Sequence, residues 1–320
     1  MRILVIGGTL FIGRHLTGAL VAAGHEVVIL HRSPASQLPP GVRGILADRN
    51  DPDAVGTALS GERFQAVFDN VYDWERGTTA AQVLATARAA NSGALERYVF
   101  MSSVAALADG LDHHDDDPLA LDDNPEAYVR NKGMSERALF AAKDIPAVTL
   151  RPPFVYGPGN PFYREAFFWD RLRDQRPIIV PGDGSALMQF VYVHDIVQCC
   201  LRVLTTPAAV AHGFNLGDGP AITQLDAVKA FAKAAGGEAD IVFVPREKAL
   251  AAGGHPMGPK YYFAQYYDLP PITMRLDGMR DILRVRPTPF EEGLRETWQW
   301  WKASNPFPPP DYSFEDSLLK

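Results

Sequence analysis

The chain has 320 residues, of which 47% are hydrophobic, 22% charged and 10% aromatic, and its formal net charge is −7. This composition is typical of a globular protein with a sizeable core, and it excludes wholesale disorder, a collagenous repeat and a coiled coil. The acidic balance argues against a surface that coats nucleic acid, because phosphate binding is built from lysine and arginine in excess.

The first half of the chain alternates short β-branched runs with longer amphipathic stretches. The runs predict strands at residues 2–6, 26–31, 43–46, 66–69, 97–102 and 147–151. The amphipathic stretches predict helices at residues 12–23, near 78–90 and near 126–142. This alternation indicates an α/β fold with a Rossmann-type, doubly wound parallel sheet.

The second half of the chain is richer in loops. Proline and glycine become frequent after residue 151, which indicates loops that can carry a substrate site. We predict that residues 1–155, with about 189–217, form a dinucleotide-binding domain. Residues 156–188 and 218–302 are predicted to form a smaller C-terminal substrate lobe. The Pro-rich residues 303–320 are expected to be an extended tail, packed on the surface or partly mobile.

A glycine-rich turn joins the first predicted strand to the first predicted helix. Here a pyrophosphate can approach bare backbone and be held by the N–H groups at the start of the helix. A glycine cluster alone is often no more than a turn, but the flanking strand, helix and second strand favour a dinucleotide site. The residues assigned to it are Gly7, Gly8, Thr9, Phe11, Ile12 and Gly13.

The end of the second strand indicates which dinucleotide is bound. A carboxylate there accepts the 2′-hydroxyl of NAD(H), whereas a nearby arginine accommodates the 2′-phosphate of NADP(H). This chain has His31 followed by Arg32, with Arg14 as a second possible cation, so NADP(H) is favoured and NAD(H) stays possible. These arginines can equally be solvated surface charges. Asp48 and Arg49 complete the predicted cofactor site. Asp48 is expected either to meet the adenine amino group or to be an ordinary loop carboxylate.

Three residues form the predicted catalytic group. Tyr128 and Lys132 are four residues apart on a predicted helix, so they share one face, and a nearby ammonium favours the phenolate as an acid or base. Ser103 follows the strand at 97–102, at the edge where ligands of open α/β sheets bind, and its hydroxyl would polarise the substrate oxygen. Ser102 is the rival for this role, and a cap or turn is the plain alternative.

These residues together resemble the extended short-chain dehydrogenase/reductase superfamily, of the NAD(P)-dependent epimerase/dehydratase type, with an atypical glycine motif. Further similar segments follow in order at residues 150–159, 182–184, 190–195, 214–217 and 291–294. The resemblance covers nearly the whole chain. It implies a Rossmann domain with a small C-terminal substrate lobe, Ser103, Tyr128 and Lys132 as the catalytic triad, and dimerisation through paired helices.

Departures from the family pattern narrow the predicted chemistry. Leu10 replaces the usual middle glycine of the turn, while Met188 and Phe154 align with the Arg and Asn that hold the diphosphate in nucleotide-sugar members. Without those groups a nucleotide diphosphate would lose charge-assisted hydrogen bonds. Residues 104–106 lack the acid of sugar dehydratases. The expected reaction is the interconversion of a secondary alcohol and a ketone, by reduction or epimerisation, on a sugar-like or other small polar or aromatic substrate.

The remaining features carry weaker expectations. The His and Asp run at residues 112–117 is expected to be a solvated loop over the active-site mouth rather than a metal site, and the aromatic cluster at 261–267 either lines a substrate pocket or forms lobe core. Cys199 and Cys200 are adjacent and poorly placed for a structural disulfide. No apolar run is long enough for a membrane span. We expect a cytoplasmic homodimer with a small-molecule substrate and no nucleic-acid or membrane partner.

One alternative comes from another class of protein. The glycine turn also resembles that of plastid RNA-binding proteins built on this fold, so the chain can be a non-catalytic or RNA-binding protein. The acidic charge and the intact Ser, Tyr and Lys set weigh against that alternative.

Overall fold

The computed structural model describes residues 1–34 and 37–320. Its centre is a seven-stranded sheet with all neighbouring strands parallel, in the order β12-β7-β5-β4-β1-β2-β3. The strands are β1 (Arg2–Ile6), β2 (Glu26–His31), β3 (Arg43–Leu46), β4 (Ala66–Asp69), β5 (Arg97–Met101), β7 (Ala147–Arg151) and β12 (His212–Asn215). The predicted doubly wound α/β fold is confirmed, and the strand order reverses between β1 and β4, where such sheets bind ligands.

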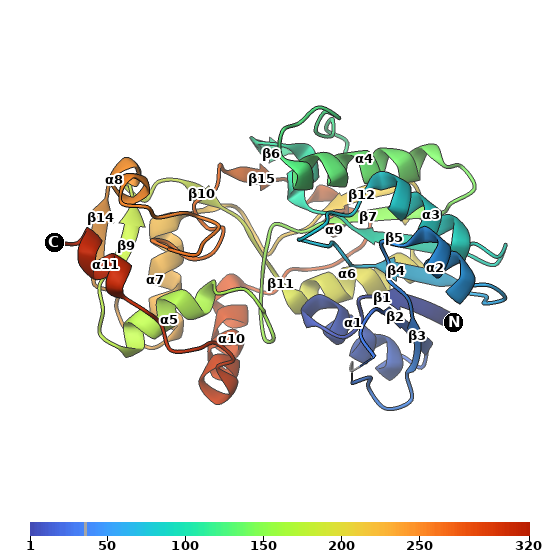
Figure 1. Cartoon of the computed structure of the whole chain (residues 1–320), viewed down its shortest axis with the longest axis horizontal. Coiled ribbons are helices and arrows are strands. Elements are labelled where there is room, and N and C mark those ends of the chain that lie inside the picture. The colour runs from blue at the N-terminus through green and yellow to red at the C-terminus, as the bar shows by residue number, and fades with distance from the viewer. Residues whose placement is uncertain (35–36) are drawn as a thin grey trace.

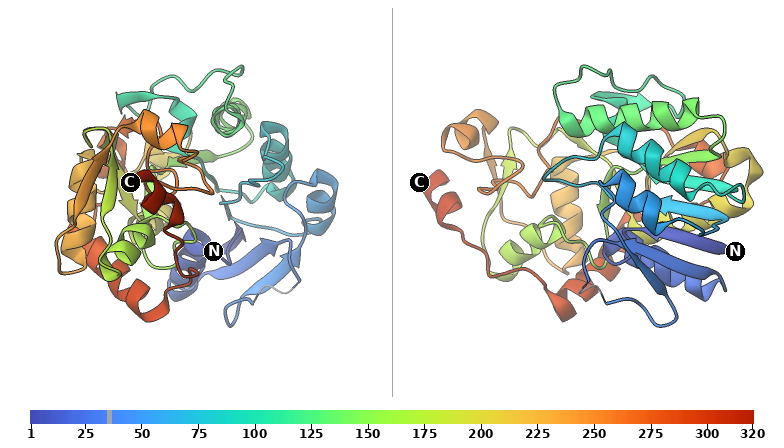
Figure 2. Two further views of the ribbon diagram at one scale, coloured as in Figure 1. Left: turned by 60° about the vertical axis from the view of Figure 1, so that its left-hand side comes forward. Right: turned by 45° about the vertical axis from the view of Figure 1, so that its right-hand side comes forward.

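Helices cover both faces of this sheet (Figures 1 and 2). On one face lie α1 (Phe11–Ala22) and α6 (Val193–Thr205), and on the other lie α2 (Pro52–Ala58), α3 (Ala80–Ala90) and α4 (Ala127–Ala141). Strand β1 shows why both faces need covering, because its successive side chains point to opposite sides. Ile3 and Val5 join the core with α1 and α6, whereas Leu4 and Ile6 join the core under α2 to α4.

A smaller lobe lies beside the sheet, at the left of Figure 1. Stacked rings of Phe168, Phe231 and Tyr267 lie in its core. Its helices and strands are α5 (Glu165–Arg173), β9 (Ile178–Pro181), α7 (Gln224–Ala234), β14 (Ile241–Val244), α8 (Arg246–Ala251) and α10 (Phe290–Ser304), with α11 (Ser313–Leu318) at the C-terminus. Two short ladders, β8 (Phe154–Tyr156) with β11 (Phe190–Tyr192) and β10 (Leu187–Met188) with β13 (Ile222–Thr223), complete it.

One segment of the predicted lobe returns to the sheet. Strand β15 (Ile272–Met274) pairs with β6 (Gly110–His113), and α9 (Asp277–Asp281) packs on β12. Short 3-10 turns at Val104–Leu107 and Pro207–Ala209 complete the described elements. The run of His and Asp at 112–117 therefore begins in a paired strand and is not wholly a solvated loop, as the sequence had indicated.

The C-terminal tail differs from the extended segment expected from its prolines. Helix α11 closes it, and the buried Glu315 accepts hydrogen bonds from Arg171 of α5, with 2.7 Å between Arg171 Nε and Glu315 Oε1. A helix of six residues has too little periodicity to be recognised, and it is fixed by tertiary contacts: this ion pair, a second one between Arg176 and Asp316, and the buried Leu318. Among the described residues, no helix has the length and apolarity needed to cross a bilayer.

Candidate active site

The glycine turn lies at the carboxyl end of β1, where the backbone is closely packed. Gly7 has φ of +81°, which favours glycine, and a Cβ added to Gly13 would lie 1.9 Å from the Gly7 carbonyl oxygen. A Cβ on Gly8 would lie 2.8 Å from both Ile29 and Thr17 side chains, and the Thr17 hydroxyl donates to the Gly8 carbonyl at 3.1 Å. The turn therefore requires glycine at these positions and presents bare backbone.

The start of α1 leaves its first N–H groups for a ligand. Leu10 is the N-cap residue, and it supplies no side-chain hydrogen bond to the helix. Its side chain is exposed, while Phe11 turns into the core with φ of +38°. Thr9 and Ile12 are partly buried in the same turn. Uncapped N–H groups at a helix N-terminus attract anions, so the geometry suits a phosphate group.

Tyr128 and Ser103 come together at the same edge of the sheet. Tyr128 begins α4, and Ser103 follows β5 and starts the short 3-10 turn by accepting a hydrogen bond from the Ala105 N–H at 3.2 Å. Burial raises the pKa of Tyr128 to about 12, and a hydrogen bond with Ser103 opposes part of that rise. The rival Ser102 is committed elsewhere, because its hydroxyl donates to the buried Glu136 at 2.5 Å. Ser103 is thus both a cap and the hydroxyl next to the phenol.

Lys132 lies one turn further along α4 and is buried. Its Nζ donates to the Met101 carbonyl at 2.7 Å and lies 5.7 Å from the centre of the Tyr128 ring. Burial lowers the pKa of Lys132 to about 8. Desolvation is the largest influence on the pKa of Tyr128 in this structure, and the expected effect of the lysine on the phenol stays a prediction.

Aromatic rings lie beside the half-buried Tyr128, a feature that sequence reasoning missed. Tyr72 lies edge-on at 4.8 Å between ring centres, and Trp74 stacks on Tyr128 at 4.7 Å. Tyr266 stacks on the far side of Trp74 at 6.2 Å and contacts Phe162 at 5.9 Å. The ring set comes from the segment after β4 and from the lobe, so only the folded chain assembles it.

The glycine turn, the uncapped α1 and the Tyr and Lys pair agree with a comparison of the sequence with known families. Residues 3–217 match the model of the family described as NAD dependent epimerase/dehydratase. This chain belongs to that family. The matched region contains every residue of the predicted cofactor and catalytic groups.

The known relatives of this epimerase/dehydratase chain include one named as a binding protein and one named as a reductase. It is 33% identical to the chloroplast stem-loop binding protein of 41 kDa b from Arabidopsis thaliana, over 73% of this chain and 63% of that protein. It is 32% identical to 3-diazoavenalumate denitrifying reductase of a Streptomyces species, over 65% of this chain and 73% of that protein. The chain thus spans less than two thirds of the length of the first of these relatives.

Solved structures share the fold. UDP-glucose 4-epimerase from Thermotoga maritima superposes with a TM-score of 0.76 and 19% identity, covering 95% of this chain and all of the other. At that identity the likeness concerns the architecture alone, which here is the Rossmann-type sheet with its smaller lobe.

The residues predicted for the adenosine end of the cofactor site lie among more charged groups than the sequence had indicated. Arg76, on the segment after β4, pairs with Asp48 at 2.8 Å and with Asp73 at 2.7 Å. The exposed Arg32 reaches the same Asp73 at 3.1 Å. Hydrogen bonds from the Arg76 backbone and guanidinium hold the pKa of Asp73 at about 2. His31, at the end of β2, contacts the Ser33 carbonyl at 2.9 Å.

Two predicted cations have different environments. The guanidinium of Arg49 is buried against β4 and α3, where it pairs with Asp69 at 2.5 Å and donates to Thr86 at 3.1 Å. The Arg49 guanidinium is thus already paired within the protein, and its role at the cofactor site stays a prediction. Arg14 remains exposed on α1.

A dinucleotide also fits a polar group that the protein leaves unpaired. Asn70 follows β4 beside Gly7, and among the described residues neither of its buried side-chain N and O atoms has a hydrogen-bond partner. Buried amides without partners are costly, so a ligand in the cradle would satisfy this one. Phe154 and Met188, in contrast, offer no polar side-chain group: the Phe154 ring lies 4.9 Å from that of Tyr267 and 5.5 Å from the Arg164 guanidinium, and Met188 is buried.

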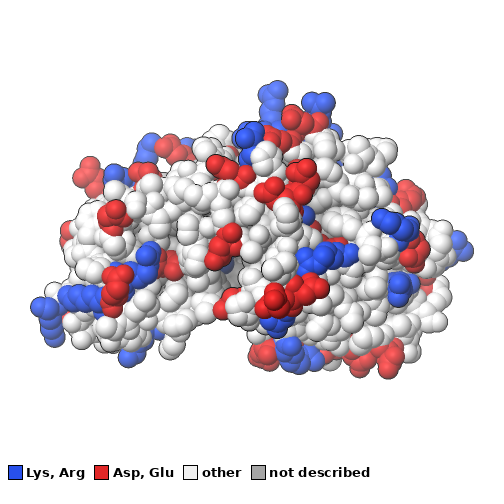
Figure 3. All heavy atoms as spheres, turned by 90° about the horizontal axis from the view of Figure 1, so that it is seen from above, with Lys and Arg blue, Asp and Glu red and all other residues white. Residues whose placement is uncertain are grey.

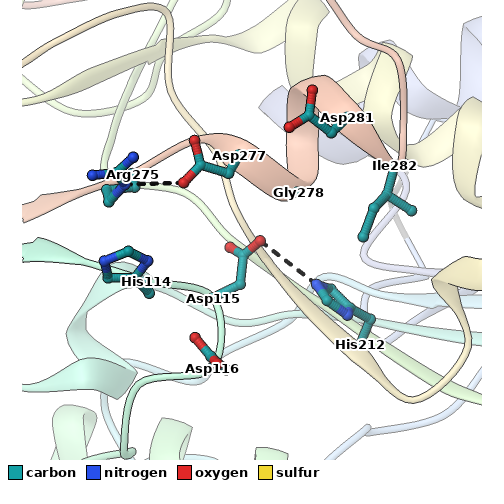
Figure 4. Close-up of a pocket in the computed structure, with 9 residues that line it drawn as sticks. All are labelled: His114, Asp115, Asp116, His212, Arg275, Asp277, Gly278, Asp281 and Ile282. Carbon is teal, nitrogen blue, oxygen red and sulfur yellow. Dashed lines mark hydrogen bonds and ion pairs between the residues drawn. The ribbon is translucent and has the colours of Figure 1, made fainter.

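A pocket of about 300 Å³ lies apart from the predicted site and shares no residue with the glycine turn or the Tyr128 surroundings (Figure 4). Its Asp115 faces His212 at 3.6 Å, and its Arg275 pairs with Asp277. In residues 1–34 and 37–320 no group of three or more His, Cys, Asp or Glu is arranged to hold a metal ion.

The aromatic residues at 261–267 have two different environments. Tyr266 joins the phenol site, whereas Tyr262, Phe263 and Tyr267 belong to the core.

Proposed function

We propose that this chain is an NAD(P)-dependent oxidoreductase or epimerase that interconverts a secondary alcohol and a ketone. One observation carries the proposal: the phenol of the half-buried Tyr128 lies with Ser103 and Lys132 at the carboxyl edge of a parallel sheet whose glycine cradle binds a dinucleotide in the family to which the chain belongs. A bound nicotinamide supplies or accepts the hydride. The side chains of the protein must then supply the proton and orient the reacting oxygen.

Each of the three side chains has a separate role in this proposal. Tyr128 gives a proton to the substrate oxygen during reduction, and its raised pKa keeps the phenol protonated at neutral pH. Ser103 donates a hydrogen bond to the same oxygen and holds it beside the phenol. Lys132 stabilises the phenolate that forms, and it holds the ribose of the coenzyme. The rings of Tyr72 and Trp74 pack against Tyr128 and fix the position of its ring, while Trp74 itself stays exposed to solvent.

We propose NADP(H) as the preferred coenzyme, with NAD(H) as the alternative. Arg32 and Arg76 lie together after the ends of β2 and β4, and both already contact Asp73. A 2′-phosphate would give them a second anion to bind. Titration with NADPH and NADH tests this preference, and tighter binding of NADH would refute it.

The proposed substrate is small, with a polar or aromatic body. The rings at the phenol favour it, and the apolar packing of Phe154 and Met188 disfavours a nucleotide diphosphate. Relatives named as reductases include that of 3-diazoavenalumate and a 2-alkyl-3-oxoalkanoate reductase. We also propose a cytoplasmic location. We propose in addition that the chain forms a homodimer, and size-exclusion chromatography with light scattering would detect the dimer.

Replacement of Tyr128 by Phe tests the proposed chemistry. Tyr128→Phe removes the proton donor and keeps the ring, so turnover of an accepted ketone should fall by about 10² to 10⁴. Coenzyme affinity should change little. The matched control is Tyr312→Phe on the C-terminal tail, which removes a hydroxyl that donates a hydrogen bond to Asp174. Full turnover by Tyr128→Phe would end the catalytic assignment.

A second candidate function is RNA binding without redox turnover. It is favoured by the 33% identity to the chloroplast stem-loop binding protein. The net charge of −7 weighs against it, and on the face drawn in Figure 3 basic side chains are interspersed with acidic ones. A gel shift with a stem-loop RNA, run beside a coenzyme fluorescence titration, separates the two functions.

A further inference from the structure

Arg164, directly before α5, is a buried cation surrounded by aromatic rings. Only 9% of its surface is exposed. Its guanidinium carbon lies 4.5 Å from the centre of the Phe162 ring and 5.5 Å from that of Tyr266. Phe154 and Tyr267 complete the surroundings at 5.5 and 5.7 Å. The rings position the guanidinium, but they do not neutralise its charge.

Arg164 differs from the other buried arginines in having no carboxylate partner. The three others of the described chain each pair with an acid: Arg49 with Asp69, Arg151 with Glu136 and Arg171 with Glu315. Within residues 1–34 and 37–320 no carboxylate oxygen lies within 4.0 Å of the Arg164 guanidinium nitrogens.

The hydrogen bonds of Arg164 are long and incomplete. Nε donates to the Gln265 carbonyl at 3.3 Å and Nη1 to the Val155 carbonyl at 3.4 Å, whereas Nη2 donates to no group of the described chain. The adjacent Glu165 does not compensate, because its carboxylate accepts from Tyr267 and Asn160. An unpaired charge is costly to bury, so an anionic group of a ligand would be bound favourably by this guanidinium.

A row of aromatic side chains connects this guanidinium to the Tyr128 ring. Tyr266 lies against Arg164 and also stacks on Trp74, which in turn stacks on Tyr128. The positive charge of Arg164 is close enough to lower the pKa of Tyr128, although burial raises it more. A substrate whose carbonyl reaches the phenol would therefore extend along the Trp74 and Tyr266 rings toward the cation.

We propose that Arg164 binds a carboxylate of the substrate, so that the enzyme acts on a keto acid or hydroxy acid with a flat, unsaturated or aromatic body. The planar guanidinium matches a carboxylate in a bidentate pair, and the rings match a flat skeleton. One cation balances one carboxylate, whereas a phosphate dianion would leave charge unpaired. This inference rests on the proposed reductase or epimerase function and names its substrate class.

Paired acids and esters test the proposal. The probes are ortho-, meta- and para-acetylbenzoate, each beside its neutral methyl ester, with the protein saturated with oxidised coenzyme for calorimetry and supplied with reduced coenzyme for turnover. At least one acid should bind more tightly than its ester by about tenfold to a hundredfold. It should also show the higher kcat/KM. Equal binding of every acid and its ester, or binding of no probe, would overturn the proposal.

Variants of Arg164 complete the test. Arg164→Gln should abolish the preference for the acid while leaving coenzyme affinity unchanged, and Arg164→Lys should restore part of it. Arg137→Gln, which removes an exposed arginine paired with Asp122, is the control. If Arg164→Gln does not fold, the test rests on Arg164→Lys. The proposal would then be overturned if Arg164→Lys preferred the acid over its ester as strongly as the native protein does. Loss of coenzyme binding by the native protein would instead count against the proposed function.

Discussion

The clearest structural consequence of the glycine cradle is the contrast between two Gly→Ala substitutions in the same helix. A Cβ at Gly13 would lie 1.9 Å from the Gly7 carbonyl oxygen, against the 3.0 Å below which real Cβ contacts are essentially never seen. The Gly7 backbone would have to withdraw by about 1 Å, and its φ of +81° leaves it little freedom to do so. Overpacking of this kind destabilises a protein by about 1 to 3 kcal/mol.

The cost to ligand binding should exceed the cost to folding. The displaced Gly7 backbone belongs to the surface on which the pyrophosphate would rest, so Gly13→Ala should weaken coenzyme binding by about a hundredfold or more, as expected from the loss of several charge-assisted hydrogen bonds. Gly18→Ala is the matched control, because no atom lies within 4 Å of its Cβ position on the exposed face of α1. It should raise the free energy of unfolding by about 0.5 to 1 kcal/mol.

Urea unfolding and calorimetric titration with NADPH, applied to both variants, measure these effects. Binding by Gly13→Ala within a factor of about two of the native value would refute the reasoning, since RT ln 2 is smaller than any lost hydrogen bond. Equal destabilisation by Gly18→Ala would refute it as well.

Three further expectations concern charged groups. Burial lowers the pKa of Lys132 to about 8, so ketone reduction should decline as the pH rises through 8 and the ammonium is lost. Lys132→Arg keeps its charge, so it should move this decline to higher pH, which a pH profile of kcat/KM measures. Arg76→Ala should raise the dissociation constant of NADPH by about tenfold and leave that of NADH nearly unchanged; equal effects on both would contradict its proposed contact with the 2′-phosphate. Glu315→Ala should lower the free energy of unfolding, measured in urea, by about 3 to 5 kcal/mol, because Arg171 would keep a buried charge without its partner. A decrease below about 1 kcal/mol would show that the tail helix is dispensable.

Much of the fold could be predicted from the sequence, because its determinants are local. The β-branched runs of β1, β2 and β7 lie between helix-period stretches, and the observed strands match the predicted ranges within a residue. The cradle was predictable for the same reason, since Gly7 and Gly13 are close in the chain and flanked by a strand and a helix.

The residues that sequence reasoning missed depend on contacts between distant segments. Trp74 acquires its place only when the lobe brings Tyr266 against it, and Arg164 is notable only because the folded chain offers it no carboxylate. Asn70 could have been suspected, because it follows a strand at the carboxyl edge of the sheet. The raised pKa of Tyr128 could not be foreseen, because it depends on burial rather than on spacing to Lys132.

The most direct test of the proposed enzyme is calorimetric titration of the folded native protein with NADPH and, separately, with NADH. We predict saturable binding at one site per chain, with NADPH the tighter ligand at micromolar concentration. Absence of binding by either dinucleotide would contradict the proposed cofactor site and the chemistry assigned to Tyr128.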